Sequence, residues 1–354
     1  MTDQTPTRAE HPMSSPGRFR SALSALSFRN ASALWVLVVI MIVFSITIPR
    51  TFLAPGTWAS LLDAQVVVAL TAIGVVIPLA AGVFNLAIGV QVGTASIMLG
   101  WLLIPMGVPI AVAIPITIIA SAVIGFLTGV IIVVFRIDSF IATMGVSSLL
   151  TALIAILSGS RQILGMPTPL VEFATSQIAG LTLPFLTMIV IAAVVWYLLE
   201  RTPLGRRVYA VGGNPEAARL SGIRVGRVVI GSLTASGAIF GIAGVLLTAR
   251  LGNADPTIGA AYLLPAFTAA FLGSTQFRGG RFNVWGTVLS VYVLAIGIKG
   301  LQLSGAPTWI SDAFNGAALL VAVGLASSVR YGGRPSLLQR VRTRWQERAR
   351  RSTA

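Results

Sequence analysis

The sequence lacks most of the residues on which enzyme chemistry depends. It has no cysteine, so neither a disulfide nor thiol catalysis is available. Its one histidine, His11, lies in a polar tail, which removes histidine-based acid–base catalysis and metal clusters from the apolar body. Only 10% of the 354 residues are charged while 55% are hydrophobic, and the mean hydropathy is +0.89. This composition predicts an all-α polytopic membrane protein.

Nucleotide-binding and ion-carrying signatures are missing as well. The phosphate-binding loop G-x-x-x-x-G-K-[ST] is absent, and the only lysine is Lys299, so the chain does not energise itself with ATP. The apolar segments hold almost no charge, whereas carriers of protons or ions usually keep carboxylates there. A stand-alone carrier or channel remains an alternative class, and a membrane-embedded enzyme is a less favoured one. We expect no catalytic residue, no metal site and no cofactor in this chain.

Ten apolar segments predict about ten transmembrane helices between residues 31 and 328. Most are long enough to cross a hydrocarbon core of about 30 Å, although the eighth is short enough to be a partial or tilted element. We expect residues 1–30 to be a disordered cytoplasmic tail and residues 329–354 a basic cytoplasmic tail. The segments are approximately 31–49, 64–83, 88–105, 108–135, 139–158, 181–199, 228–249, 261–275, 283–302 and 309–328.

The distribution of basic residues predicts the orientation of the chain. With the N-terminus inside and ten spans threaded, 21 of the 25 basic residues fall on the inner side. The four on the outer side are Arg50, Arg161, Arg250 and Lys299. Both termini and the loop at 200–227 are therefore predicted to be cytoplasmic. The net charge of +15 then reflects topology and attraction to membrane lipid, and we expect no nucleic-acid partner.

The polar loop at 201–227 contains the signals of a short surface helix. It carries six arginines and one internal acid, Glu216. Asn214 can cap the free amides of a helix, Pro215 suits the first helical position, and Glu216 favours the positive end of the helix dipole. Gly222 can end the helix in a left-handed conformation. Such a helix can act as a lever between a membrane domain and a soluble partner; a solvated connector is the alternative.

The turn between the second and third apolar segments reads AGVFNLAIGVQVG, residues 81–93. Irregular backbone at membrane depth is tolerated only where protein or a water-filled cavity covers it. Asn85 and Gln91, polar in apolar surroundings, are therefore candidates for lining a substrate pathway together with Phe84. A simple tight turn at the membrane surface is the alternative.

These stretches resemble the ribose-type permeases of ABC transporters, a family that includes branched-chain amino-acid permeases. The loop phrase GRRVYAVGGNPEAARLSGI contains the EAA---G core of such permeases, and it lacks the Ile-x-Leu-Pro extension of the maltose-type branch. Residues 82–89 resemble the phrase G-x-[FI]-D-L-S-[IV]-G, with Asn85 and Ala87 in place of Asp and Ser. Residues 138–145 resemble P-x-F-I-x-T-L-G, and residues 273–287 resemble a glycine-rich phrase of the family.

The resemblance implies a permease subunit in a bacterial inner membrane that pairs with a second permease subunit. It further implies an extracytoplasmic solute-binding protein that delivers the solute and a separate ATP-binding ABC subunit that drives transport. A monosaccharide is the leading solute, with branched-chain amino acids or nucleosides as alternatives. In the family this loop forms the coupling helix that docks on the ATP-binding subunit. That role would fall to Asn214, Glu216, Ala217, Ala218, Arg219 and Gly222.

Overall fold

Helices account for most of the structure, as expected where lipid leaves the backbone no other hydrogen-bond partner. The computed structural model describes residues 32–276 and 280–331, so the two predicted tails lie outside it apart from residues 329–331. Each of the ten apolar segments contains a helix. The apolar helices are α2 (Ser32–Thr47), α4 (Pro55–Ala64), α5 (Val66–Ala80), α6 (Ile88–Leu103), α7 (Ile110–Phe135), α8 (Ser139–Ser158), α10 (Leu183–Arg201), α13 (Val225–Leu251), α14 (Leu263–Ser274), α15 (Val284–Leu303) and α16 (Ile310–Tyr331).

Six of these helical segments are long and apolar enough to cross a membrane, counting α4 and α5 together as one. The four other apolar stretches are shorter where the structure describes their side chains, and they are Leu37–Thr47, Ile88–Leu103, Ile258–Ser274 and Ile310–Gly324. The eighth segment is short, as predicted. Its helix α14 has 12 residues and is therefore about 18 Å long, well under the thickness of a hydrocarbon core.

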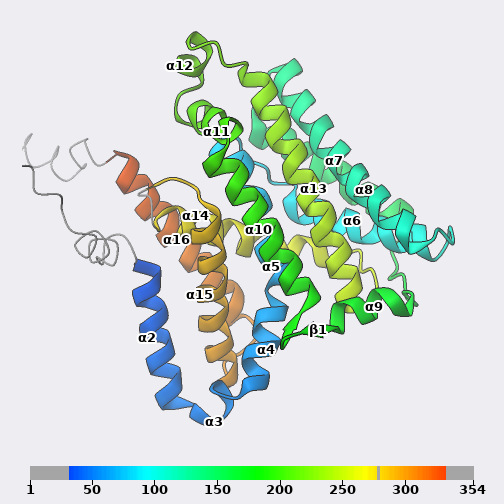
Figure 1. Ribbon diagram of the computed structural model, residues 1–354, viewed down its shortest axis with the longest axis vertical. Coiled ribbons are helices and arrows are strands. Elements are labelled where there is room, and N and C mark those ends of the chain that lie inside the picture. Colours follow the sequence, from blue (N-terminus) through cyan, green and yellow to red (C-terminus); the bar gives the residue numbers. More distant parts are fainter. Residues whose placement is uncertain (1–31, 277–279, 332–354) are drawn as a thin grey trace, which may run out of the picture.

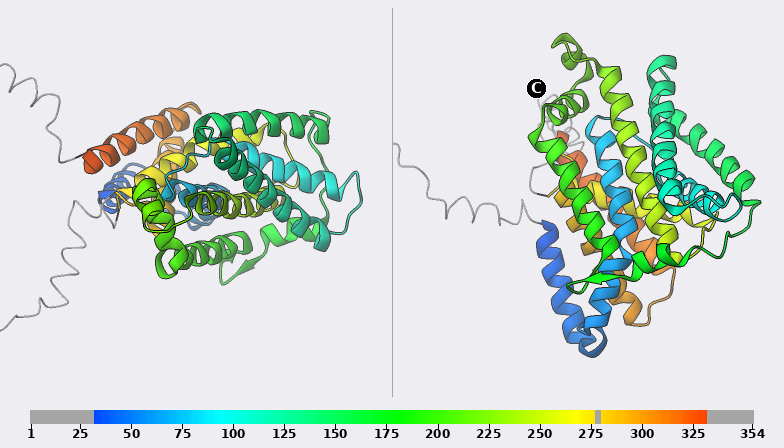
Figure 2. Two further views of the ribbon diagram at one scale, coloured as in Figure 1. Left: turned by 90° about the horizontal axis from the view of Figure 1, so that it is seen from above. Right: turned by 45° about the vertical axis from the view of Figure 1, so that its right-hand side comes forward.

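Helix α5 lies at the centre of the bundle, with all but one of its 15 residues buried. Helices α2 and α16 lie to one side of it and α7 and α8 to the other (Figures 1 and 2). Close helix contacts depend on glycine: a Cβ on Gly74 of α5 would lie 2.5 Å from the ring of Phe240 in α13. Gly125 and Gly237 likewise let α7 and α13 meet backbone to backbone.

The two ends of the bundle carry different connecting elements (Figure 1). One end carries the predicted surface loop, which forms two helices, and the opposite end carries a hairpin and short helices. The two strands of the hairpin pair Gln177 with Thr182 and Ile178 with Leu181. The turn between them consists of Ala179 and Gly180, both with positive φ. The connecting elements are α3 (Pro49–Phe52), α9 (Thr168–Thr175), β1 (Gln177–Ile178), β2 (Leu181–Thr182), α11 (Pro203–Gly213), α12 (Pro215–Leu220) and the 3-10 helix η1 (Ile258–Tyr262).

Two loops at the hairpin end are tied together. Ile163 and Ala254 form an antiparallel bridge, and the Gln162 amide donates to the Asp255 carboxylate at 2.6 Å. Asp255 also accepts hydrogen bonds from the backbone N–H and the hydroxyl of Thr257, and these bonds lower the pKa of its carboxyl group. The acid therefore orders this loop.

Candidate functional site: a surface helix and the helix break beneath it

The predicted surface helix is present as α12. The Asn214 side chain accepts hydrogen bonds from the backbone N–H groups of Glu216 and Ala217, both at 3.0 Å. Pro215 occupies the first turn, where its missing N–H leaves no hydrogen bond unmade. The start of the helix, predicted from these three residue types, is confirmed.

The other end of α12 also forms as predicted. Gly222 has φ +81°, the left-handed conformation that favours glycine. Its N–H donates to the Arg219 carbonyl at 3.0 Å, and the Ile223 N–H donates to the Ala218 carbonyl at 3.0 Å. This pair of bonds is the Schellman arrangement, which satisfies carbonyls at the helix end. The geometry of the helix is thus confirmed, while its coupling role stays a prediction.

The outer surface of α12 combines charge with one large apolar side chain. Glu216 and Arg219 form an exposed ion pair at 3.2 Å, a type of contact that adds at most about 1 kcal/mol of stability. Leu220 is 90% exposed, whereas Ala218, on the inner face of the helix, is buried. Leu220 was not predicted as a site residue, although a leucine in a basic loop is a usable signal.

Helix α11 was missed in the sequence, where residues 201–213 were treated as part of a loop. Thr202 followed by Pro203 is a helix-start signal, and the apolar Val208 and Val211 fall on one side of the helix. The Tyr209 hydroxyl donates to the Phe282 carbonyl at 2.7 Å. The Arg281 guanidinium lies 4.0 Å from the centre of the Tyr209 ring. These contacts fix α11 to the segment that precedes α15.

The C-terminal end of α11 rests on the end of α5. Gly212 packs so closely that a Cβ there would lie 3.0 Å from the Gly82 backbone nitrogen and closer still to the Ala80 carbonyl oxygen. Gly82 has φ +80° and ends α5 with the same pair of hydrogen bonds that ends α12. Because Asn214 both ends α11 and caps α12, the two surface helices meet at a single residue.

Below this contact the chain is not helical between α5 and α6, and α8 supplies partners for its backbone. The Phe84 N–H donates to the Ser139 hydroxyl at 3.3 Å, and the Leu86 N–H donates to the Thr143 hydroxyl at 3.1 Å. Two family-like phrases, residues 82–89 and 138–145, therefore meet in space. Side chains of α8 thus replace some of the helical hydrogen bonds that this break lacks. Sequence reasoning did not identify either hydroxyl.

The three proposed pathway residues occupy different surroundings. Phe84 is 42% exposed and stacks on Phe271, with ring centroids 6.5 Å apart. Asn85 is buried, and its side-chain oxygen accepts from the Ala87 N–H at 3.0 Å, which shapes the turn. Gln91 is also buried and donates to the Ser121 carbonyl of α7 at 2.8 Å. Phe84 alone of the three presents a large exposed surface, and the pathway role of all three stays a prediction.

The described part of the chain shows no group of three or more His, Cys, Asp or Glu side chains that could hold a metal ion. The arrangement found instead is a capped surface helix, α12, that is joined through α11 to the non-helical segment between α5 and α6.

Comparison with known proteins gives this arrangement a family context. Residues 57–323 match the family model described as branched-chain amino acid transport system / permease component. The autoinducer 2 import system permease protein LsrD of Yersinia enterocolitica is 32% identical over 262 residues, covering 72% of this chain and 79% of the relative. LsrD of Photorhabdus laumondii is 29% identical over 294 residues, covering 81% and 88%. No solved structure matches.

Proposed function

Because the chain belongs to the permease-component family of branched-chain amino acid transport systems, within the ABC transporters, we propose that it is the membrane-spanning subunit of an ATP-driven importer in a bacterial inner membrane. Relatives of this family are transport subunits, so ATP hydrolysis belongs to a separate ATP-binding subunit. The chain forms the route for the solute and receives mechanical work from that partner.

The capped helix α12 is the observation that carries this proposal. It is short, defined at both ends, and carries an exposed leucine beside an ion pair. Complete burial of a leucine side chain by a partner contributes about 1.5–3 kcal/mol, which is more than the exposed ion pair contributes. We assign Leu220 as the apolar anchor of the docked ATP-binding subunit, with Glu216 and Arg219 orienting the contact.

The helices beneath α12 provide a path for its movement. When the ATP-binding subunit shifts α12, Asn214 passes the displacement to α11. The backbone contact between Gly212 and Gly82 then passes it to the break between α5 and α6. Because no side chain lies between these two glycines, α11 has little freedom to slide without moving the break. Hydroxyl hydrogen bonds from α8 and the stack of Phe84 on Phe271 oppose a rearrangement of this segment.

The solute is proposed from the relatives and from the resemblance to ribose-type permeases. LsrD proteins are named for import of autoinducer 2, and a small polar, sugar-like molecule is the solute we propose for this chain. A binding protein on the outer side delivers it, and a second permease subunit completes the pathway. Branched-chain amino acids or nucleosides are the alternatives that an uptake assay separates.

Capture of the ATP-binding subunit tests the docking assignment. The full-length chain is tagged, co-expressed with the ATP-binding subunit of the same importer, and purified in a mild detergent. We expect the pair to co-purify and Leu220→Ser to reduce the captured subunit about tenfold or more. Leu251→Ser is the matched control, because Leu251 is also exposed but ends α13 at the opposite end of the bundle. Equal capture by Leu220→Ser and wild type would remove Leu220 from the interface.

A further inference from the structure

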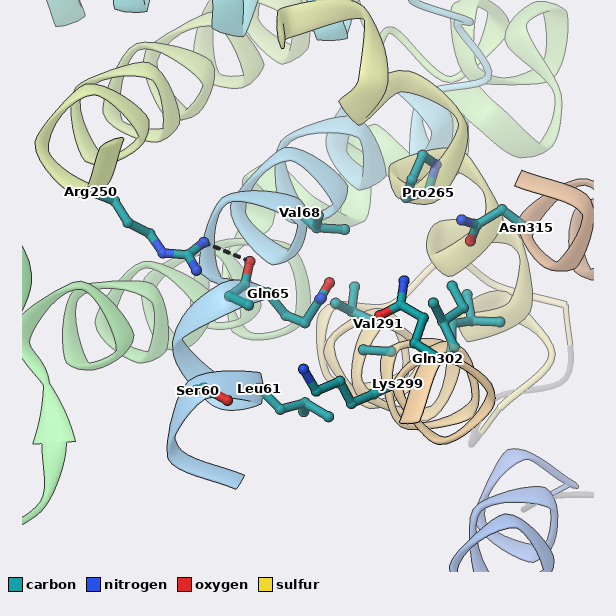
Figure 3. A pocket seen from close by; sticks show the side chains of 14 residues that line it. Ser60, Leu61, Gln65, Val68, Arg250, Pro265, Val291, Lys299, Gln302 and Asn315 are labelled. Carbon is teal, nitrogen blue, oxygen red and sulfur yellow. Dashed lines mark hydrogen bonds between the residues drawn. The ribbon is translucent and has the colours of Figure 1, made fainter. Parts of the chain in front are cut away.

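A polar cavity opens at the end of the bundle opposite α12. It has a volume of about 390 Å³ and lies between α4, α5, α14, α15 and α16, close to the last residues of α13 (Figure 3). Leucine, valine and alanine side chains form much of its wall. Its polar lining residues are Ser60, Gln65, Arg250, Lys299, Gln302 and Asn315.

One of the two cations in this lining is already neutralised. The Arg250 Nε lies 2.8 Å from the Asp63 carboxylate, and Arg250 Nη1 donates to the Ala64 carbonyl at 3.0 Å. Asp63 also accepts a hydrogen bond from the Thr182 hydroxyl at 2.8 Å. Arg250 and Asp63 therefore form a pair that joins the ends of α13 and α4.

The second cation, Lys299, has no acid partner among the described residues. Its side chain leaves α15 and crosses toward α4, into the space that Gln65 and Gln302 also enter (Figure 3). Lys299 is half-buried, so part of the hydration of its ammonium group is lost to the cavity wall. A partly desolvated charge without a partner is unfavourable, and binding an anion relieves that cost.

We propose that this cavity is a binding site for a phosphate group, held by the Lys299 ammonium with the Gln65 carboxamide as a further donor. The Gln302 carboxamide donates one N–H to the Ser311 hydroxyl at 3.0 Å, and its second N–H completes the site. An ammonium is a compact point charge that binds phosphate well, and neutral amides add direction without adding charge. The phosphate is carried either by a soluble molecule that enters from the outer side or by an anionic phospholipid. The site goes beyond the importer function and does not depend on coupling to ATP.

The sequence provides a direct readout, because Lys299 is the only lysine. An amine-reactive sulfonated ester can therefore modify only Lys299 and the N-terminal amine, and peptide mass spectrometry separates the two. The full-length chain is labelled in dodecyl maltoside micelles, which contain no phosphate. One arm adds inorganic phosphate, a second adds phosphatidylglycerol, and a third adds neutral ribose. We expect phosphate in at least one of the first two arms to slow labelling of Lys299 about tenfold at saturation, and ribose to leave it unchanged.

The variant Arg161→Lys controls for general surface charge. Arg161 is exposed, lies at the same end of the bundle and is outside the cavity, so a lysine there reports any non-specific effect of the added anion. Protection of Lys299 by inorganic phosphate assigns a soluble ligand, and protection by phosphatidylglycerol alone assigns the lipid. Protection in neither arm, or equal protection of the lysine at position 161, overturns the proposal.

A second variant tests the amides without touching the reporter lysine. Gln65→Leu removes one donor while keeping the size of the side chain, and the Gln65 side chain makes no hydrogen bond to the described part of the chain. We expect the phosphate or phosphatidylglycerol concentration that gives half protection of Lys299 to rise about tenfold. An unchanged concentration would mean that Lys299 acts as an isolated surface charge and would contradict the assigned site.

Discussion

Gly212 of α11 and Gly82 at the end of α5 touch backbone to backbone, with no space for a side chain between them. The two residues are far apart in the sequence and belong to different family-like phrases. Their contact joins the surface helices to the non-helical segment that follows α5. In the proposed mechanism every movement of α12 reaches the solute route through this point.

Adding one methyl group at Gly212 tests that contact. Gly212→Ala places a Cβ against the Ala80 carbonyl and the Gly82 nitrogen, so we expect overpacking of about 1–3 kcal/mol and loss of most solute uptake. Gly213→Ala is the matched control, because a Cβ on the next residue meets no atom within 4 Å. Uptake and thermal unfolding are measured for both variants. Equal uptake by the two variants would show that the glycine contact does not transmit movement.

The hydroxyl of Thr143 is predicted to stabilise the break between α5 and α6. In Thr143→Val the part-buried Leu86 N–H loses its acceptor, which costs about 1 kcal/mol. Thr143→Ser restores a hydroxyl and should restore stability. Thr151→Val, on the exposed side of the same helix, serves as the control because the Thr151 hydroxyl bonds only its own helix. The midpoint of thermal unfolding should fall for Thr143→Val and for none of the other variants.

The orientation follows from the charge distribution and is directly measurable, since the chain contains no cysteine. Ser221→Cys places a thiol at the exposed end of α12, and Ser176→Cys places one at the opposite end of the bundle. In intact cells a membrane-impermeant maleimide should label position 176 and leave position 221 unlabelled until the cells are opened. Labelling of position 221 from outside would reverse the proposed orientation.

Local signals explain how much of the site could be predicted from the sequence. Each end of α12 is set by residues within about one turn of that end. Asn214 and Pro215 were therefore sufficient to predict the start of the helix, and Gly222 was sufficient to predict its end. The segments that became apolar helices were equally visible, because hydrophobicity over some 20 residues is also a local property.

The remaining features depend on contacts between distant segments. Helix α11 is stabilised by Phe282 and by Gly82, neither of which is near it in the sequence. Gln91 could be recognised as a polar residue in an apolar helix, but only the fold shows that it bonds to Ser121 of α7. The cavity around Lys299 is lined by residues of six helices, and a single lysine in the sequence does not predict its neighbours.

Substrate-stimulated ATP hydrolysis by the reconstituted importer tests the central claim, that α12 couples the ATP-binding subunit to the solute route. Gly222→Val opposes the positive φ that ends the helix, and Glu216→Lys breaks the pair with Arg219 and places a positive charge at the positive end of the helix dipole. The account predicts that the loaded binding protein stimulates hydrolysis in the wild type, and that in both variants this stimulation is lost or the ATP-binding subunit no longer assembles. Wild-type stimulation with wild-type uptake in both variants would contradict it, because α12 would then be only a connector.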